Sequence, residues 1–153
     1  MMALYGPRTA RLFLAIVVSI AATPLHASHE LDYRDIEKGQ VLYAEHCATC
    51  HGADLEGQPD RRVANDDGTL PAPPHDETGH TWHHDNRLLF DYTRLGGQAA
   101  LEERGVTGFQ SAMPAFGEVL TDVEIWEVLA YIRSTWPERV QEMQASRNPP
   151  HNN

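Results

Sequence analysis

The sequence contains little cysteine and little basic charge. Its 153 residues include only two cysteines, so a zinc site made of two cysteine pairs is excluded. Lysine and arginine number 12 against 22 acidic residues, and the formal net charge is −10. A negative charge of this size disfavours binding to nucleic acid or to an anionic membrane surface. The length is that of one small domain with a single hydrophobic core.

The sequence also lacks a long apolar run. The main one, residues 12–22, follows Arg8 and Arg11 in a segment without acidic residues, and it is shorter than the roughly 20 residues that span a bilayer. Together with the small residue Ala27, this pattern predicts a secretory signal peptide over residues 1–27. The alternative is an N-terminal membrane anchor that is retained. Cleavage leaves about 126 residues with a formal charge of −12.

Alternating apolar and polar residues, the pattern of a half-buried strand, are missing as well. Helical spacing is present instead. Ile36, Gly39, Tyr43 and Cys47 recur at intervals of three and four, and Asp32 precedes them as a candidate cap. The sequence therefore predicts an all-α fold whose first helix leads into Cys47.

Two further helices are predicted. Residues 85–95 form one, with Gly96-Gly97 as its stop. Its predicted inward-facing residues are Leu88, Leu89, Tyr92 and Leu95. The other begins at residues 121–124, which read Thr-Asp-Val-Glu and match a capping box, and it stops before Pro137.

The most informative motif is Cys47-Ala48-Thr49-Cys50-His51, because Cys-x-x-Cys-His is the attachment site of a c-type haem. Two cysteines three apart on one helical turn can bond the two vinyl groups of one haem. The adjacent His51 is then held against the iron as its proximal ligand. One such motif predicts one covalently bound haem c, with Cys47 and Cys50 as its thioether residues.

A Cys-x-x-Cys pair also occurs in zinc sites, in thioredoxin-like redox motifs and in structural disulfides. A thioredoxin-like motif lies in a strand-helix-strand unit, which this sequence does not predict. The adjacent His46 keeps a mixed cysteine and histidine zinc site open as an alternative. The order of the five residues favours haem over each of these.

The residues around the motif carry a family resemblance. The pattern Gly39-x3-Tyr43-x3-Cys47-x2-Cys50-His51, with the later Met113-Pro114 and Ala130-Tyr131-Ile132, resembles a class I c-type cytochrome over roughly residues 33–136. The resemblance implies a small all-α domain of three to five helices around one haem. We place this domain at residues 28–138 and expect a mobile tail at 139–153.

The resemblance also implies where the first and last helices meet. They are expected to cross at Gly39, close to Tyr131 and Tyr43, because only glycine lets two backbones approach so closely. The family's distal iron ligand is a methionine on a later loop, and Met113 occupies that place. Its alternative is an ordinary core methionine, and the other methionine after residue 27, Met143, lies beyond the predicted last helix.

Four histidines, His75, His80, His83 and His84, fall within ten positions. Three interpretations stay open. One histidine replaces Met113 as the distal ligand, several bind a second metal such as copper, or the segment lines the haem edge with Trp82 packed on the porphyrin or the core. His51 should donate its other ring nitrogen to a backbone carbonyl, which the resemblance places within residues 71–74.

The function that the resemblance implies is a periplasmic carrier of single electrons with a haem iron ligated by His51 and Met113, and not an enzyme. Its expected partners are redox proteins with basic docking surfaces, membrane-bound respiratory complexes among them. The alternatives are a peroxidase-like enzyme or a sensor with an open distal site, or a cytochrome subunit of a larger oxidoreductase. Covalent haem attachment in bacteria outside the cytoplasmic membrane agrees with the predicted export.

Overall fold

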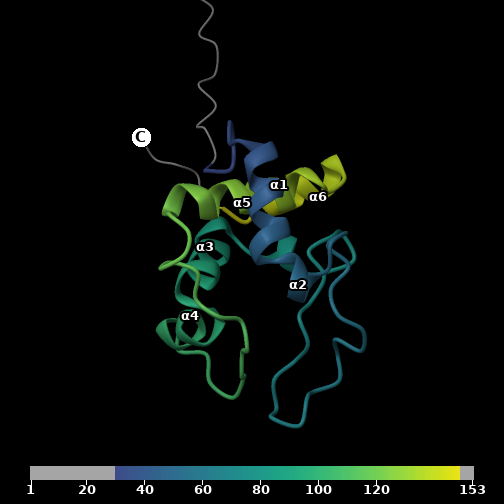
Figure 1. Ribbon diagram of the computed structural model, residues 1–153, viewed down its shortest axis with the longest axis vertical. Coiled ribbons are helices and arrows are strands. Elements are labelled where there is room, and N and C mark those ends of the chain that lie inside the picture. The colour runs from purple at the N-terminus through teal and green to yellow at the C-terminus, as the bar shows by residue number, and fades with distance from the viewer. Residues whose placement is uncertain (1–29, 149–153) are drawn as a thin grey trace, which may run out of the picture.

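All regular secondary structure in residues 30–148, the part of the chain that the computed structural model describes, is helical (Figure 1). The elements are α1 (Ile36–His46), α2 (Ala48–His51), the 3-10 helix η1 (Thr81–His83), α3 (Asn86–Leu95), α4 (Gly97–Glu103), α5 (Asp122–Ser134) and α6 (Glu138–Ala145). The all-α prediction is confirmed. The described range holds six α-helices where three to five were expected, because the short α2 and α4 and the final α6 were not predicted.

Helix α1 begins later than predicted. Its N-cap is Asp35, whose carboxylate accepts the backbone N–H of Lys38 at 3.0 Å. The predicted cap, Asp32, instead lies 3.5 Å from the guanidinium of Arg133 in α5. Tyr33 between the two candidates has a φ of 58°, and this left-handed conformation interrupts any helix that starts at Asp32.

Helices α1 and α5 cross at Gly39, as predicted. A Cβ on Gly39 would overlap the backbone carbonyl of Glu127 and would lie 3.0 Å from Cβ of Tyr131. Tyr43 lies one turn further along α1, where its ring centroid is 5.5 Å from that of Tyr131. The core gathers around this crossing from the buried residues Leu42, Tyr43, Ile125, Val128, Leu129 and Ile132.

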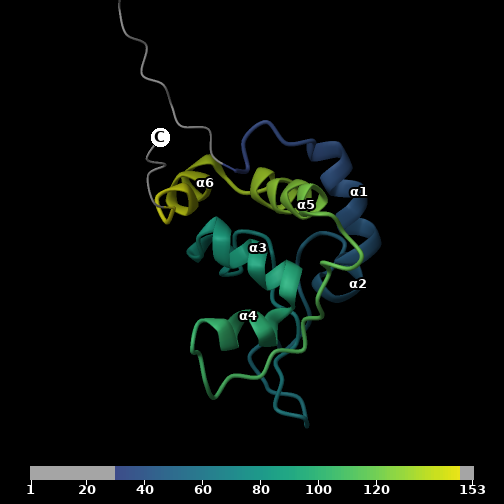
Figure 2. The ribbon, with the colours of Figure 1, turned by 90° about the vertical axis from the view of Figure 1, so that its left-hand side faces the viewer.

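Figure 2 shows α5 and α6 across one end of the molecule, with α3 and then α4 beneath them. Helix α3 begins after Asp85, whose carboxylate accepts the N–H of Leu88 at 2.7 Å. The predicted inward face is only partly right, because the buried members of α3 are Asn86, Phe90, Asp91 and Thr93. Phe90 stacks on Trp126 of α5 with ring centroids 4.5 Å apart.

The burial of Asp91 is one part of this difference. Its carboxylate is buried because two arginines neutralise it, Arg87 at 2.9 Å and Arg104 at 3.0 Å. Helical spacing alone assigns an aspartate to the solvent side, whereas paired charges can be buried. The predicted stop is right for α3, since Gly96 ends it with a φ of 84°, but the chain re-enters a helix at once as α4.

The tail predicted from residue 139 begins as helix α6. It buries Val140 and Gln144, and the Gln144 amide donates to Oδ1 of Asn86 at 2.8 Å. The sequence pattern did not predict this helix. An amide such as that of Gln144 can be buried when it is hydrogen-bonded. Residues 149–153 and the predicted signal peptide at 1–27 lie outside the described residues. Within residues 30–148, no helix has both the length and the apolar character needed to cross a bilayer.

Candidate functional site

The five-residue motif forms a tight continuation of α1. Cys47 ends α1, with its N–H donating to the carbonyl of Tyr43 at 2.9 Å, and it also precedes α2. The N–H groups of Cys50 and His51 then donate to the Cys47 carbonyl at 3.1 and 2.9 Å. The predicted single helical turn between the two cysteines is confirmed.

Both thiols are free, and their surroundings differ. Burial, with a smaller contribution from Cys50, raises the pKa of Cys47 to about 11. Cys50 is exposed. One cysteine is therefore packed against the core and the other is exposed.

His51 is buried and oriented by one hydrogen bond. It is 7% exposed, and its Nδ1 lies 2.8 Å from the carbonyl oxygen of Pro73. Since a carbonyl can only accept, Nδ1 carries the proton and Nε2 is left as a lone-pair nitrogen, the form that binds a metal. Burial lowers the pKa of His51, although the bond to Pro73 opposes this shift. The predicted acceptor within residues 71–74 is confirmed as Pro73.

Pro73 is held in place by the return of a long loop. Between α2 and η1 the chain makes an excursion that hangs below the helices in Figure 1. At its base the N–H of Gly57 donates to the carbonyl of His51 at 2.7 Å and that of Gln58 to Ala72 at 2.9 Å. Gly57 has a φ of 72°, and a Cβ there would lie 2.5 Å from the nitrogen of Pro74. Only glycine permits this approach, which brings the proline segment against His51.

A second imidazole lies on His51. The ring centroids of His51 and His75 are 4.0 Å apart and their planes differ by 26°. Burial lowers the pKa of His75 well below its ordinary value, with smaller contributions from His51 and His80. Because its ring stacks on the face of His51, His75 cannot ligate from the side opposite His51. The sequence analysis did not predict that His75 stacks on His51. The one feature of the sequence that points to this contact is the position of His75, two residues after Pro73.

The other three histidines lie on or beside η1. His80 and His84 meet edge to face with ring centroids 5.4 Å apart, while His83 packs on Trp82 at 3.7 Å. Within residues 30–148, no group of three or more histidine, cysteine or acidic side chains is arranged to hold a metal ion. Trp82 is half-buried against the core, as one of the predicted alternatives proposed.

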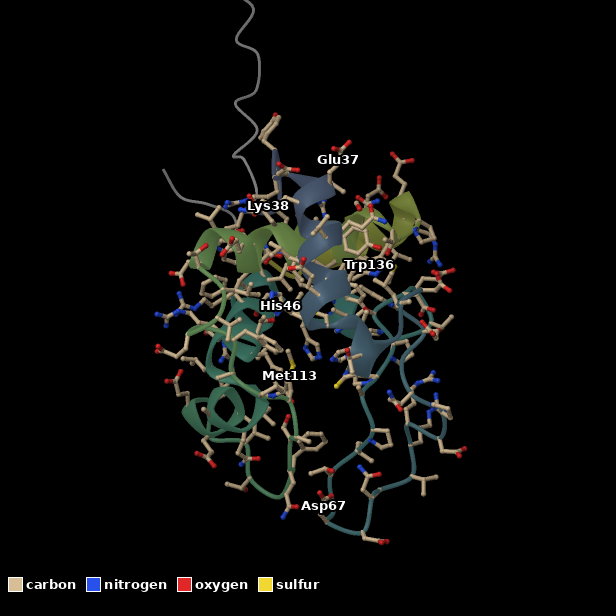
Figure 3. The ribbon with its side chains drawn as sticks, in the orientation of Figure 1. Glu37, Lys38, His46, Asp67, Met113 and Trp136 are labelled. Atoms are coloured by element: carbon tan, nitrogen blue, oxygen red, sulfur yellow. The ribbon has the colours of Figure 1, made fainter. Side chains whose placement is uncertain are left out.

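Met113 lies on the segment between α4 and α5. Figure 3 places it across from the loop that follows α2, alongside α3 and α4. The Met113 carbonyl accepts the N–H of Gly97 at 3.0 Å, and its N–H donates to the hydroxyl of Ser111 at 3.3 Å. That hydroxyl also accepts a hydrogen bond from Tyr92 at 2.8 Å. The paired glycines Gly96-Gly97 give this segment its place, since a Cβ on Gly96 would lie 2.9 Å from the N–H nitrogen of Ala115.

The comparison with protein families decides the identity. The family model described as Cytochrome c matches residues 36–136, a range that includes α1, the motif, Met113 and α5. The chain belongs to the cytochrome c family. No curated protein and no solved structure matches it.

Cytochromes c bind haem c covalently through Cys-x-x-Cys-His, and the residues from Cys47 to His51 fit that motif. Members of the family are generally electron carriers. The structure of this cytochrome fits such a group, because two free thiols lie one helical turn apart and the adjacent imidazole presents an unprotonated nitrogen.

Proposed function

We propose that this cytochrome carries single electrons between redox proteins, with Cys47 and Cys50 attaching one haem and His51 and Met113 as the iron ligands. The observation that carries the proposal is the 2.8 Å hydrogen bond from Nδ1 of His51 to Pro73, beside two free thiols. When bound, the haem supplies an iron that cycles between the ferrous and ferric states. The protein's own residues determine how that iron is held.

The proximal residues hold a neutral imidazole in one orientation. His51 is buried, so water does not compete for its nitrogen, and Pro73 fixes which ring nitrogen keeps the proton. The Gln58 amide donates to the Cys50 carbonyl at 3.0 Å, which ties the end of the motif to the following loop. A site of this kind changes little between two charge states, which suits electron transfer.

Met113 would close the other side. A thioether is a soft, uncharged ligand that raises the reduction potential relative to harder ligands, and it leaves no position for a substrate. Support comes from its half-buried position on the segment anchored at Gly97 and Ser111. This closure is what separates a carrier from a peroxidase-like enzyme or a sensor.

We place the cytochrome in the periplasm and expect partners with basic docking surfaces, membrane-bound respiratory complexes among them. The charge pattern and apolar run of residues 1–27 support export, and the formal charge of −12 after cleavage supports attraction to basic surfaces. Electron-transfer rates with such a partner should fall as salt concentration rises. Mass spectrometry of the protein from a periplasmic fraction should give a chain that starts after Ala27; a full-length mass would indicate the retained anchor.

A redox titration with a ligand challenge tests the proposal. The purified holoprotein should titrate reversibly as a one-electron couple, and carbon monoxide should bind the ferrous form slowly or not at all. Rapid, tight binding of carbon monoxide, or turnover with peroxide at enzymatic rates, would contradict the carrier role and favour an open distal site. Carbon monoxide binding should become rapid in Met113→Ala, which shows how an open distal site behaves in this protein. Met143→Ala is the matched control and should bind carbon monoxide as wild type does.

A further inference from the structure

His75 is a half-buried group that electron transfer through Cys47, Cys50, His51 and Met113 does not require. It nevertheless lies flat against the proposed iron ligand, 4.0 Å from the His51 ring by centroids and 26° from parallel. The two residues belong to different segments, α2 and the end of the following loop. Such a contact between segments is set by the fold and does not follow from chain connectivity.

The backbone of His75 is anchored at both polar groups. Its N–H donates to the carbonyl of Leu55 at 2.8 Å. Its carbonyl accepts the indole N–H of Trp136 at 2.7 Å, and Trp136 is 3% exposed. The residue is therefore tied both to the loop that leaves α2 and to the segment that joins α5 to α6.

The ring of His75 is held as firmly as its backbone. Nδ1 and the hydroxyl oxygen of Thr81 are hydrogen-bonded at 2.9 Å, and Thr81 is buried in η1. The ring and that of Tyr43 meet edge to face, with centroids 6.3 Å apart and planes at 75°. Because the His75 ring stacks on His51, contacts Tyr43 and is hydrogen-bonded to Thr81, it has little freedom to turn.

One hydrogen bond does not orient an imidazole completely. The bond from His51 Nδ1 to Pro73 fixes one edge of the ring but still permits rotation about the line that joins the two atoms. A flat group against the ring face removes that rotation. Since the plane of a ligating imidazole sets its overlap with the iron orbitals, the orientation of the plane affects the magnetic anisotropy and the potential of the iron.

We propose that His75 is a positioning residue that fixes the ring plane of His51 by stacking on it, with Thr81 fixing His75 in turn. The inference rests on the proposed function in one respect, namely that His51 ligates the haem iron. The His51 ring plane is fixed by the stacked ring of His75 more than by the hydrogen bond between His75 and Thr81. Another flat ring should therefore substitute for His75.

Two replacements of His75 distinguish the effect of a stacked ring from the effect of merely filling the space beside His51. His75→Phe keeps a flat ring and loses the bond to Thr81, whereas His75→Leu fills similar space without a flat face. The readout is the proton spectrum of the ferric holoprotein, in which the order of the haem methyl resonances reports the plane of the histidine ligand. The midpoint potential is measured on the same samples. His84→Ala is the matched control, because His84 belongs to the same histidine-rich segment but contacts His80.

We expect His75→Leu to change the order or spread of the methyl resonances and to shift the midpoint potential. His75→Phe, which keeps the flat ring and loses only the bond to Thr81, should change both in a smaller measure, and His84→Ala should leave both unchanged. An unaltered spectrum in His75→Leu would overturn the inference. Equal changes in the Leu and Phe variants would overturn it too, because they would assign the effect to the bond with Thr81.

Thr81→Val keeps the test decisive if His75→Leu does not retain haem. It leaves both imidazoles and removes the hydroxyl that anchors His75, so it should move the methyl resonances in a smaller measure; no movement would contradict the proposal. Failure of the proposed function is seen separately, in wild type, as the absence of the near-red ferric band of sulfur ligation. Failure of the present inference is an unmoved spectrum in a wild-type protein that has that band.

Discussion

The two sides of the proposed haem site are built differently. On the side of His51, the motif, the loop base and His75 are joined by a dense set of contacts, with Pro73, Thr81 and Trp136 as partners. On the side of Met113, residues 104–117 are held to α3 and α4 mainly by backbone hydrogen bonds, among them those from Phe116 to Thr93 and from Gly117 to Arg94, both at 3.0 Å. A Cβ on Gly105 or Gly108, in the exposed turn of this segment, would meet no other atom within 4 Å, although both glycines have a positive φ.

Because of this difference, the orientation of the His51 side chain is fixed by its neighbours more completely than that of Met113. His51 has its tautomer, burial and ring face determined by neighbouring residues. Met113 is positioned mainly through its backbone, at Gly97, and through a hydroxyl chain from Tyr92 to Ser111. We therefore expect the methionine side to be where ligand exchange occurs, and the histidine side to be lost only together with the fold.

The largest effect should come from removing the two cysteines that attach the haem beside His51. Replacing both Cys47 and Cys50 by serine should abolish covalent haem. Because the haem is expected to form part of the core, the cooperative unfolding transition should be lost as well. Haem staining on a denaturing gel and thermal unfolding by circular dichroism measure the two effects, with Thr49→Ser as the control. A haem-free double variant that unfolds cooperatively at the wild-type temperature would show that the histidine side does not depend on the cofactor.

A change at the α1–α5 crossing should lower the stability of the whole domain, and with it both sides of the site. Gly39→Ala places a Cβ against the Glu127 carbonyl in the α1–α5 crossing, and overpacking of this kind costs about 1–3 kcal/mol. Denaturant unfolding of the holoprotein gives the loss of unfolding free energy. Gly105→Ala adds a methyl in open space at a φ of 70°, so it measures the cost of backbone strain without a clash. The absence of a loss in Gly39→Ala would contradict the steric role of the crossing.

Two tyrosine hydroxyls allow the sides to be weakened one at a time. Tyr92→Phe removes the bond to Ser111 at 2.8 Å, and Tyr43→Phe removes the bond to the Gly52 carbonyl at 3.0 Å. Each loss should lower the unfolding free energy by about 0.5–1.5 kcal/mol. Imidazole binding to the ferric holoprotein should tighten in Tyr92→Phe alone. Similar tightening in both variants would remove the distinction between the two sides.

The smallest effect should come from a site remote from both ligands. The Thr121 backbone and hydroxyl lower the pKa of Glu124 from its ordinary 4.5 in the capping box of α5. A lowered folded pKa means that the stabilisation is present above pH 4.5 and is lost as the pH falls through the folded pKa. Glu124→Gln should therefore flatten the fall in melting temperature below pH 4.5 and leave the ferric spectrum unchanged. A steeper acid dependence in the variant would contradict the capping role.

Much of this architecture follows from local patterns. The α1–α5 crossing at Gly39, the capping box at Thr121 and the helical turn between Cys47 and Cys50 were predictable because each depends on residues close in sequence or on the family motif. The acceptor for His51 could be narrowed to residues 71–74 but not to Pro73, because the choice depends on how the loop closes at Gly57.

The failures have a common cause in long-range pairing. The buried carboxylate of Asp91 depends on Arg104, and Gln144 of α6 is buried because Asn86 accepts its amide hydrogen bond. His75 reaches His51 only through the loop closure. Each of these polar residues is interpreted as a surface group until its partner is known, and helical periodicity carries no information about the partner.

Ligation of the haem iron by Met113 is tested by the near-red absorption spectrum of the ferric holoprotein, recorded for wild type and for Met113→Ala. We expect a weak charge-transfer band of sulfur ligation in wild type, its loss in Met113→Ala and its retention in Met143→Ala. A wild-type spectrum without the band, or a band that survives in Met113→Ala, would contradict ligation by Met113 and with it the closed site on which the electron-carrier function depends.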